Sequence, residues 1–151
     1  MPKPPKVAKL TAAERQIAAG IKKRLRTINI TRHLDFHLAD ASRGRVVITM
    51  RVTAKHLQAH KVVHGGILAA LADSAGGLAT YMAIAPGMRC ATVEMKINFL
   101  EAVAKGKVTA VAEVVRIGRH LSVVDCDITD DSGRLVCKAL MTFFVGSFPK
   151  S

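Results

Sequence analysis

Asp73 is the side chain best suited to chemistry in this sequence. It is the one carboxylate between positions 41 and 93, and the residues around it are almost all apolar. Burying a carboxylate without a partner is costly, so an acid in such surroundings is a candidate catalytic base or nucleophile. The structural alternative is an aspartate that faces water or bonds to a neighbouring hydroxyl, Ser74 or Thr80.

A second candidate feature, His64-Gly65-Gly66, begins the same stretch. Two glycines at a helix start leave backbone amides unshielded by Cβ atoms, at the positive end of the helix dipole. Such amides can bind an oxygen that becomes negative during a reaction. Asp73 lies about 12 Å along a helix from Gly65, too far for one substrate to reach both easily within one chain. If both are catalytic, they must meet across the interface of a dimer.

The elements that must position these residues show two different periodicities. Residues 65–83 are rich in alanine and leucine and predict a helix that ends before Ala85-Pro86-Gly87 and is buried on most sides. Gly76 and Gly77 within it indicate a close approach of backbone or ligand. Runs typical of strands cover 33–39, 45–53, 93–99, 107–117, 121–129 and 134–146, with turns at 117–120 and 130–133. The sequence therefore predicts an α+β fold in which five or six antiparallel strands wrap around one long central helix.

Residues 1–32 are set apart by their charge, with nine basic residues against one acid. Thr11-Ala12-Ala13-Glu14 fits a capping box, and the apolar spacing after it predicts an extra amphipathic helix over about 12–26. That helix could pack on the domain, on a partner chain or on anionic lipid. We expect 1–32 to be a basic, solvated extension, with membrane contact as the lesser alternative, and 33–148 to be the folded domain.

Composition restricts the classes of protein that fit. The 151 residues carry a net charge of +12 but only one tyrosine, five phenylalanines and no tryptophan, so rings for stacking bases are scarce and we expect no nucleic-acid partner. No apolar run is long enough to cross a bilayer and no apolar leader begins the chain, so we expect a cytoplasmic protein. Cys90, Cys126 and Cys137 fit neither a disulfide framework nor a zinc site, and we predict no metal.

Several of these segments in order resemble a known family. Five segments occur in a fixed order: Gln58, His64-Gly65-Gly66, Asp73, the strand 91–100 and Arg116-Ile117-Gly118-Arg119. Over about residues 33–146, this series resembles the hotdog-fold acyl-CoA thioesterases. The nearest branch looks like the phenylacetate-degradation (PaaI-type) group, which includes the Arthrobacter-type 4-hydroxybenzoyl-CoA thioesterase. The resemblance implies a hotdog fold, edge-to-edge homodimers that pair into tetramers, hydrolysis of acyl-CoA to a free acid and CoA, and no cofactor.

The same resemblance implies roles for five residues. Asp73 matches the catalytic acid, which acts as general base on water or attacks the thioester directly, and Gly65 matches the amide that polarises the thioester carbonyl. Gln58 matches a position that orients the carbonyl or the water. His64 matches the histidine that supports the site, and Thr92 falls where relatives position water or the acid. A structural histidine and a plain strand threonine are the alternatives for the last two.

Further positions match contacts to the substrate. Gly77 stands where some relatives have Ser or Thr one turn after the acid, which implies a wider acyl pocket. Gly66 lies beside the amide expected to bind the carbonyl oxygen. A basic turn is expected near the entrance of the site, where it would contact the CoA phosphates, and its candidates are Arg116, Gly118, Arg119 and His120.

We therefore expect an acyl-CoA thioesterase that acts on aryl or medium-chain acyl groups, between which the sequence does not choose. The second enzyme hypothesis is a hotdog enoyl-CoA hydratase or dehydratase that uses His64 and Asp73 on protons of the acyl chain. The hypothesis outside enzymes is a non-catalytic acyl-CoA-binding module with the basic helix as its effector arm.

Overall fold

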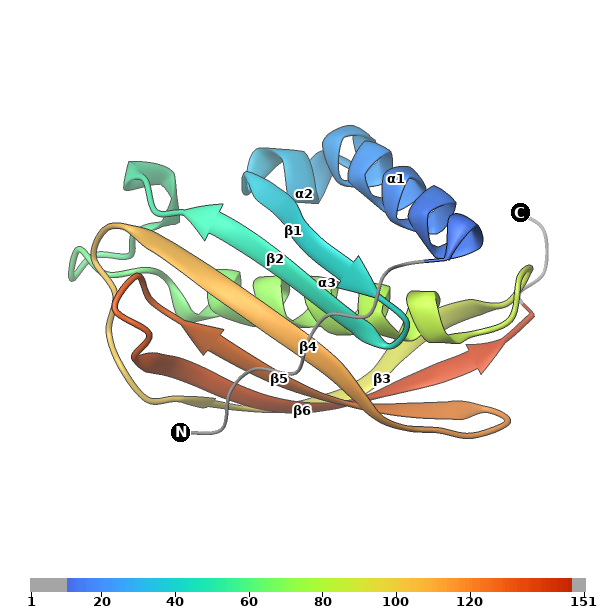
Figure 1. Ribbon diagram of the computed structural model, residues 1–151. Coiled ribbons are helices and arrows are strands. Elements are labelled where there is room, and N and C mark those ends of the chain that lie inside the picture. Colours follow the sequence, from blue (N-terminus) through green and yellow to red (C-terminus); the bar gives the residue numbers. More distant parts are fainter. Residues whose placement is uncertain (1–10, 148–151) are drawn as a thin grey trace.

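A six-stranded antiparallel sheet wraps around one helix in the computed structural model, which describes residues 11–147 apart from the side chain of Arg24 (Figure 1). The strand order is β1-β2-β4-β5-β6-β3, so β1 and β3 are the two edges. The strands are β1 (Phe36–Ser42), β2 (Arg45–Arg51), β3 (Arg89–Phe99), β4 (Lys107–Ile117), β5 (Leu121–Thr129) and β6 (Leu135–Gly146). The α+β fold expected from the sequence is confirmed.

The central helix, α3 (Gly65–Ala83), has the bounds that its composition predicts. Its small and aliphatic side chains, such as Leu71, Ala72 and Ala75, are fully buried against the concave face of the sheet. At Gly76 an added Cβ would lie 2.6 Å from the Met141 Cε atom of β6 and 3.1 Å from the Phe143 ring, so a larger residue would force these side chains to move. A Cβ on Gly77 would meet Phe143 at an ordinary 3.5 Å. The close approach is thus made by side chains of β6 at the first of the two glycines, and not by the backbone or ligand that the sequence predicts.

Two strand starts differ by three residues or more from those that the sequence predicts. The strand expected over 33–39 begins at Phe36, because a short helix, α2 (Asn29–His33), and the turn at Leu34 and Asp35 come first. The edge strand β3 begins at Arg89 rather than at residue 93, which makes it 11 residues long. The predicted turns between β4 and β5 and between β5 and β6 are confirmed.

The N-terminal helix α1 (Ala12–Thr27) packs on the domain rather than standing free (Figure 1). Its capping box is formed, with the Glu14 amide donating to Thr11 Oγ1 at 3.2 Å and the Thr11 amide donating to Glu14 Oε2 at 2.8 Å. Ile21 and Leu25 are 1% and 4% exposed and belong to the same core as the sheet. The apolar face of this helix therefore packs against the rest of the domain. A domain boundary at residue 32 stays a prediction, and residues 1–10 and 148 of the two predicted ranges lie outside the described residues.

Candidate active site

Asp73 lies on α3 and is partly buried as a residue. Its partner is Thr92 on β3, whose hydroxyl donates to Asp73 Oδ1 at 2.7 Å. A hydrogen bond to a charged acceptor is stronger than one between neutral groups, so this contact fixes one carboxylate oxygen. Neither neighbouring hydroxyl named as an alternative is its partner, because the described bonds of Thr80 run to Ser122, at 3.1 Å between the hydroxyls, and none joins Ser74 to Asp73. The structure thus brings two predicted site residues into direct contact.

The Thr92 side chain reaches Asp73 because β3 contains a bulge. In the pairing of β3 with β6, Thr92 is opposite Phe143 and Glu94 is opposite Thr142, with Val93 as the extra residue. Residues two apart in a regular strand face the same side, but here Glu94 bonds to the outer Thr142 while Thr92 faces the helix. The alternation of apolar and polar residues in this strand would have placed both on the outer face.

The start of α3 keeps one backbone amide available. His64 is the N-cap, and its Nδ1 atom accepts from the Gly66 amide at 2.9 Å. The Ile67 amide donates to the His64 carbonyl, while the Gly65 amide has no acceptor among residues 11–147. An added Cβ on Gly65 would lie 3.3 Å from the Phe99 ring, so a side chain there would displace that ring. The predicted oxyanion donor is therefore exposed by the helix cap and the glycine together.

Gln58 occupies a tight turn that leads to this helix. Its backbone amide donates to the Val62 carbonyl at 2.8 Å, and Lys61 adopts a positive φ of 63° to close the turn. Its side-chain oxygen accepts from the His60 amide at 3.0 Å. No hydrogen bond in the described part of the chain joins Gln58 to Gly65 or to Asp73. The side-chain oxygen of Gln58 is thus bonded within its own turn, and the side-chain nitrogen is the group that could face a substrate.

His56 was missed by sequence reasoning and is fully buried beneath this turn. Its Nδ1 accepts from the Thr53 amide at 3.0 Å, its Nε2 donates to the Leu34 carbonyl at 3.2 Å, and its own carbonyl accepts from the His64 amide. Burial, with help from Lys55, holds the pKa of His56 below the usual range for histidine. The ring is therefore neutral and positions the residue that caps α3. The available signal was Thr53 three residues before a histidine, the spacing of a capping box.

The two halves of the candidate site lie in separate pockets of the single chain. A groove of about 710 Å³ contains Asp73, Gly77 and Thr92, whereas a smaller pocket of about 280 Å³ contains Gly65 and Phe99. No lining residue is common to both. This agrees with the rise of an α-helix, which separates Gly65 from Asp73 by about 12 Å. One chain therefore presents an acid and an amide that do not converge.

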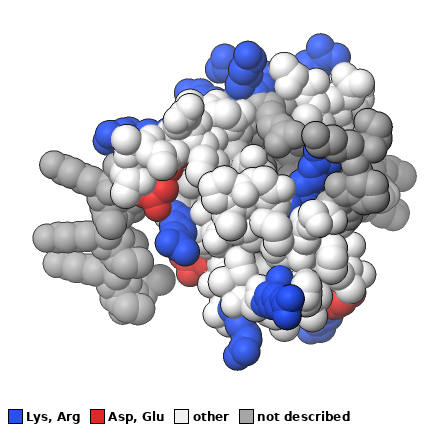
Figure 2. Space-filling view, turned by 90° about the vertical axis from the view of Figure 1, so that its right-hand side faces the viewer, with Lys and Arg blue, Asp and Glu red and all other residues white. Residues whose placement is uncertain are grey.

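The residues predicted to contact CoA phosphates lie at the end of β4 and on the turn between β4 and β5, outside both pockets. The Gly118 amide closes this turn by donating to the Leu121 carbonyl at 2.7 Å, and the His120 ring stacks on Phe144 with centroids 6.4 Å apart. Arg116 and Arg119 are exposed. Figure 2 looks onto this end of the molecule, where Lys and Arg side chains surround an uncharged middle. Within one chain this turn is separate from the acid, and its role stays a prediction.

Other chemistry finds little support in the described residues. Burial raises the pKa of the Cys126 thiol to about 12 and that of Cys137 to about 11, so neither is a thiolate at neutral pH. Between residues 11 and 147, His, Cys, Asp and Glu side chains form no group of three able to hold a metal ion. None of the helices in that range is long and apolar enough to cross a membrane.

Comparison with known proteins identifies relatives of this chain. A family model described as the thioesterase superfamily matches residues 60–137. Protein SSO2140 of Saccharolobus solfataricus is 33% identical over 116 residues, which cover 77% of this chain and 82% of that protein. The 1,4-dihydroxy-2-naphthoyl-CoA hydrolase of Listeria monocytogenes is 30% identical and covers 74% of this chain and 91% of its own length.

Solved structures agree with this assignment. The Haemophilus influenzae thioesterase HI1161 has a TM-score of 0.79 at 28% identity, with 84% of this chain and 89% of that chain covered. PaaI of Escherichia coli, from the phenylacetic acid degradation operon, has a TM-score of 0.77 at 26% identity, covering 85% and 93%. A hypothetical thioesterase of Streptococcus pneumoniae, solved with coenzyme A, has a TM-score of 0.69 at 34% identity, covering 76% and 88%.

Proposed function

Because this chain belongs to the thioesterase superfamily and is an enzyme of thioester hydrolysis, we propose that it cleaves acyl-CoA thioesters with Asp73 as its catalytic acid. The observation that carries this proposal is the hydrogen bond of 2.7 Å from Thr92 to Asp73 at the wall of a groove. The relatives support CoA as the thiol, since one is a 1,4-dihydroxy-2-naphthoyl-CoA hydrolase and another was solved with coenzyme A. The acyl group is aryl or medium-chain.

The reaction needs one base and one donor to the carbonyl oxygen. Asp73 takes a proton from water, whose oxygen bonds to the thioester carbon, while the carbonyl oxygen becomes negative and accepts from the Gly65 amide. Collapse of this intermediate breaks the carbon–sulfur bond, and the CoA thiolate takes up the proton. In the nucleophilic variant the carboxylate bonds to the carbonyl carbon first, CoA leaves, and water hydrolyses the anhydride.

A homodimer completes the site in this proposal. Within residues 11–147, β3 is hydrogen-bonded only to β6, and its other edge is unpaired over a strand of 11 residues. Its exposed residues include Val93 and Phe99, which are 57% and 52% accessible. Proteins rarely leave so long an edge unpaired, because its free N–H and C=O groups would recruit other strands. Pairing of this edge with a second copy lets Asp73 of one protomer meet Gly65 of the other, and we expect such dimers to pair into tetramers.

Two mutant structures of one relative support the pairing of a glutamine with the acid. The Staphylococcus aureus protein SAV0944 was solved with a glutamine changed to alanine and, separately, with a glutamate changed to alanine, at positions 15 residues apart. Those chains are 27% identical to this one, with TM-scores of 0.75 and 0.77. Gln58 and Asp73 have the same separation and are of the corresponding types. We therefore assign Gln58 to orienting the carbonyl or the water.

The basic turn completes the proposed substrate site. CoA carries a diphosphate and a 3′-phosphate, and the exposed Arg116, Arg119 and His120 supply positive charge for them. The Gly118 amide closes this turn, and the Gly66 amide bonds to the His64 ring beside the Gly65 amide.

The deciding experiment measures thiol release from a panel of aryl- and alkyl-CoA thioesters. Asp73→Asn keeps the shape of the side chain and should lower kcat about 10²- to 10⁴-fold, the usual contribution of a general base. The matched control is Glu113→Gln on β4, an exposed acid outside both pockets, which should hydrolyse at the wild-type rate. Wild-type activity in Asp73→Asn, or no turnover of any CoA thioester by the unmodified protein, would contradict the proposal.

A further inference from the structure

The outward side of α1 carries positive charge that no acid of the fold balances. Lys22, Lys23 and Arg26 are exposed and form no ion pair with any residue from 11 to 147. Glu14 is the one acidic residue among positions 1–34. The ion pairs in the same described range use basic residues of the sheet and its loops, namely Arg45, Lys55, Arg134 and Lys138.

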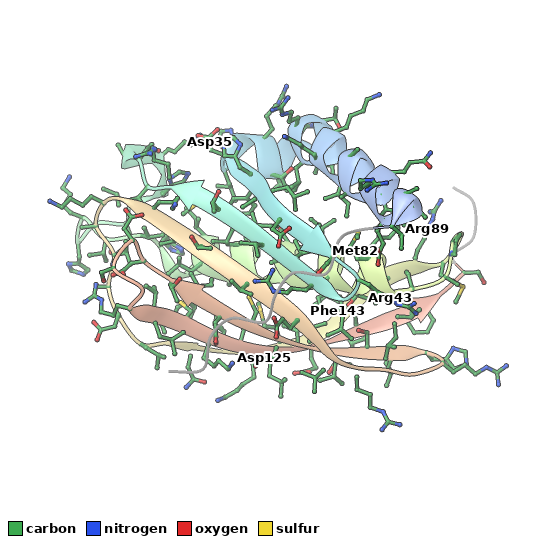
Figure 3. All side chains as sticks on the ribbon, viewed as in Figure 1. Asp35, Arg43, Met82, Arg89, Asp125 and Phe143 are labelled. Atoms are coloured by element: carbon green, nitrogen blue, oxygen red, sulfur yellow. The ribbon has the colours of Figure 1, made fainter. Side chains whose placement is uncertain are left out.

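The three basic residues share the side of α1 that faces away from the core. Ile21 is 1% exposed, and Lys22 and Lys23 follow it by one and two steps of about 100° around the helix. Arg26 lies one turn after Lys22. Figure 3 shows nitrogen-tipped side chains that project from α1 away from the sheet. Figure 2 shows Lys and Arg, but no Asp or Glu, along the top of the molecule where α1 lies. We call Lys22, Lys23 and Arg26 the basic surface.

Two large aliphatic side chains adjoin the basic surface. Ile28 and Ile30 are 44% and 57% exposed, and they lie between Arg26 and Arg32 where the chain passes from α1 to α2. At a lipid surface, aliphatic side chains enter the boundary of the acyl chains while Lys and Arg contact anionic headgroups. A nucleic-acid backbone would attract the bases equally well, but it offers no apolar phase to the isoleucines.

We propose that the basic surface and the two isoleucines beside it bind to an anionic lipid bilayer. A second copy of this face would carry the same positive charge and be repelled, so the charge selects an anionic partner. The apolar face of α1 stays packed in the core, which makes the binding peripheral and reversible. Ions in solution screen such attraction, so the affinity should fall as the salt concentration rises. This inference does not depend on thioester hydrolysis.

The test is cosedimentation of the full-length chain with vesicles of phosphatidylcholine, alone or with roughly 30% phosphatidylserine. The unmodified protein should partition at least about tenfold more strongly into the anionic vesicles at about 0.1 M salt, and lose most of that preference at about 1 M. One basic residue near an anionic leaflet strengthens binding about fivefold. The triple variant Lys22→Gln, Lys23→Gln, Arg26→Gln should therefore bind the anionic vesicles at least about tenfold more weakly.

Matched variants separate this surface from the charge of the whole chain. Arg51→Gln, Lys105→Gln, Lys107→Gln removes the same charge from exposed positions at the β2–β4 end of the sheet, and it should change the partitioning less than about threefold. Ile30→Ser should weaken binding at least about threefold, whereas Leu135→Ser, also an exposed aliphatic residue, should have no effect. Circular dichroism checks that each variant is folded.

Several results would overturn the proposal. Equal binding to both kinds of vesicle, or equal losses in the two triple variants, would mean that the basic surface does not recognise lipid. Tighter binding to duplex DNA than to anionic vesicles, unchanged in Ile30→Ser, would make it a site for a phosphate backbone instead. Because Ile28 and Ile30 also line the groove of Asp73, loss of a dimer in Ile30→Ser, measured by analytical ultracentrifugation, would assign them to the subunit interface and remove them from the lipid surface. The thioesterase mechanism is tested separately, by thiol release.

Discussion

The two halves of the candidate site are held in place by different means. The amide half, at the start of α3, is set by backbone and packing: the Gly65 amide is left open while His64 caps the helix and the Phe99 ring lies where a Cβ would be. The acid half is set by side chains, through the single hydrogen bond from Thr92 to Asp73 in an open groove.

This difference determines how each half should fail. Backbone geometry at Gly65 does not depend on a side-chain hydrogen bond, but an added Cβ there would crowd the Phe99 ring. The Asp73 carboxylate has room around it but depends on one donor for its orientation. The halves lie in separate pockets of one chain. If they meet between chains, a protomer that has lost one half should regain activity when its partner supplies that half.

The largest expected effect is recovery of activity in mixed dimers. Asp73→Asn and Gly65→Val homodimers should each lose about 10² or more in kcat, because each lacks one half at both sites. A heterodimer, purified through two different tags, has one site with both halves intact and should recover about half the wild-type activity. The control pairs Asp73→Asn with Asp73→Ala, which should recover nothing. No recovery in the first pair would mean that the two halves do not meet between chains.

The next effect tests the crowding at the amide half. Gly65→Ala keeps the backbone amide but brings its Cβ to 3.3 Å from the Phe99 ring, so kcat should fall about tenfold as the amide is displaced. Adding Phe99→Leu should restore part of that loss by removing the obstructing ring. Gly20→Ala on α1 is the control, because nothing lies within 4 Å of its new Cβ. A wild-type kcat in Gly65→Ala would show that the amide needs no such precise placement.

A comparable but smaller loss is expected at the acid half. Thr92→Val has the same shape but removes the donor to Asp73, and kcat in thiol release should fall about tenfold, as for loss of a hydrogen bond to a charged group. Thr92→Ser, which keeps a hydroxyl, should retain most of the activity. Thr109→Val on β4, outside both pockets, is the matched control. Equal activity of the serine and valine variants would mean that Thr92 only fills space.

Much of the fold could be predicted because the spacing of apolar residues along the chain distinguishes helices from strands. The apolar 65–83 segment could only be a buried helix, and the alternating runs could only be strands around it. The short helix α2 was not predicted, because five residues are too few to show a helical repeat. The partner surface of α1 was also left open, since an amphipathic face specifies that something covers it but not what.

The site was less predictable for a similar reason. Asp73 and Gly65 were recognisable by type and surroundings, but the contact between Asp73 and Thr92 depends on the bulge at Val93, a feature with no signature in one sequence. The spacing of Thr53 and His56 was the one sequence signal for His56, but its bond to the Leu34 carbonyl joins residues 22 apart and depends on the fold.

The smallest effect concerns how His56 supports the amide half. Burial holds the pKa of this histidine below its ordinary value of 6.5, so below that pH the unfolded chain takes up a proton that the folded chain does not. The free energy of unfolding should therefore fall as the pH is lowered from 7 to 5, by at most about 1.4 kcal/mol per pH unit from this residue. In His56→Gln, urea unfolding should show a shallower decline over that range, whereas the exposed His60→Gln should keep the wild-type slope. Equal slopes in all three proteins would mean that folding does not hinder the protonation of His56.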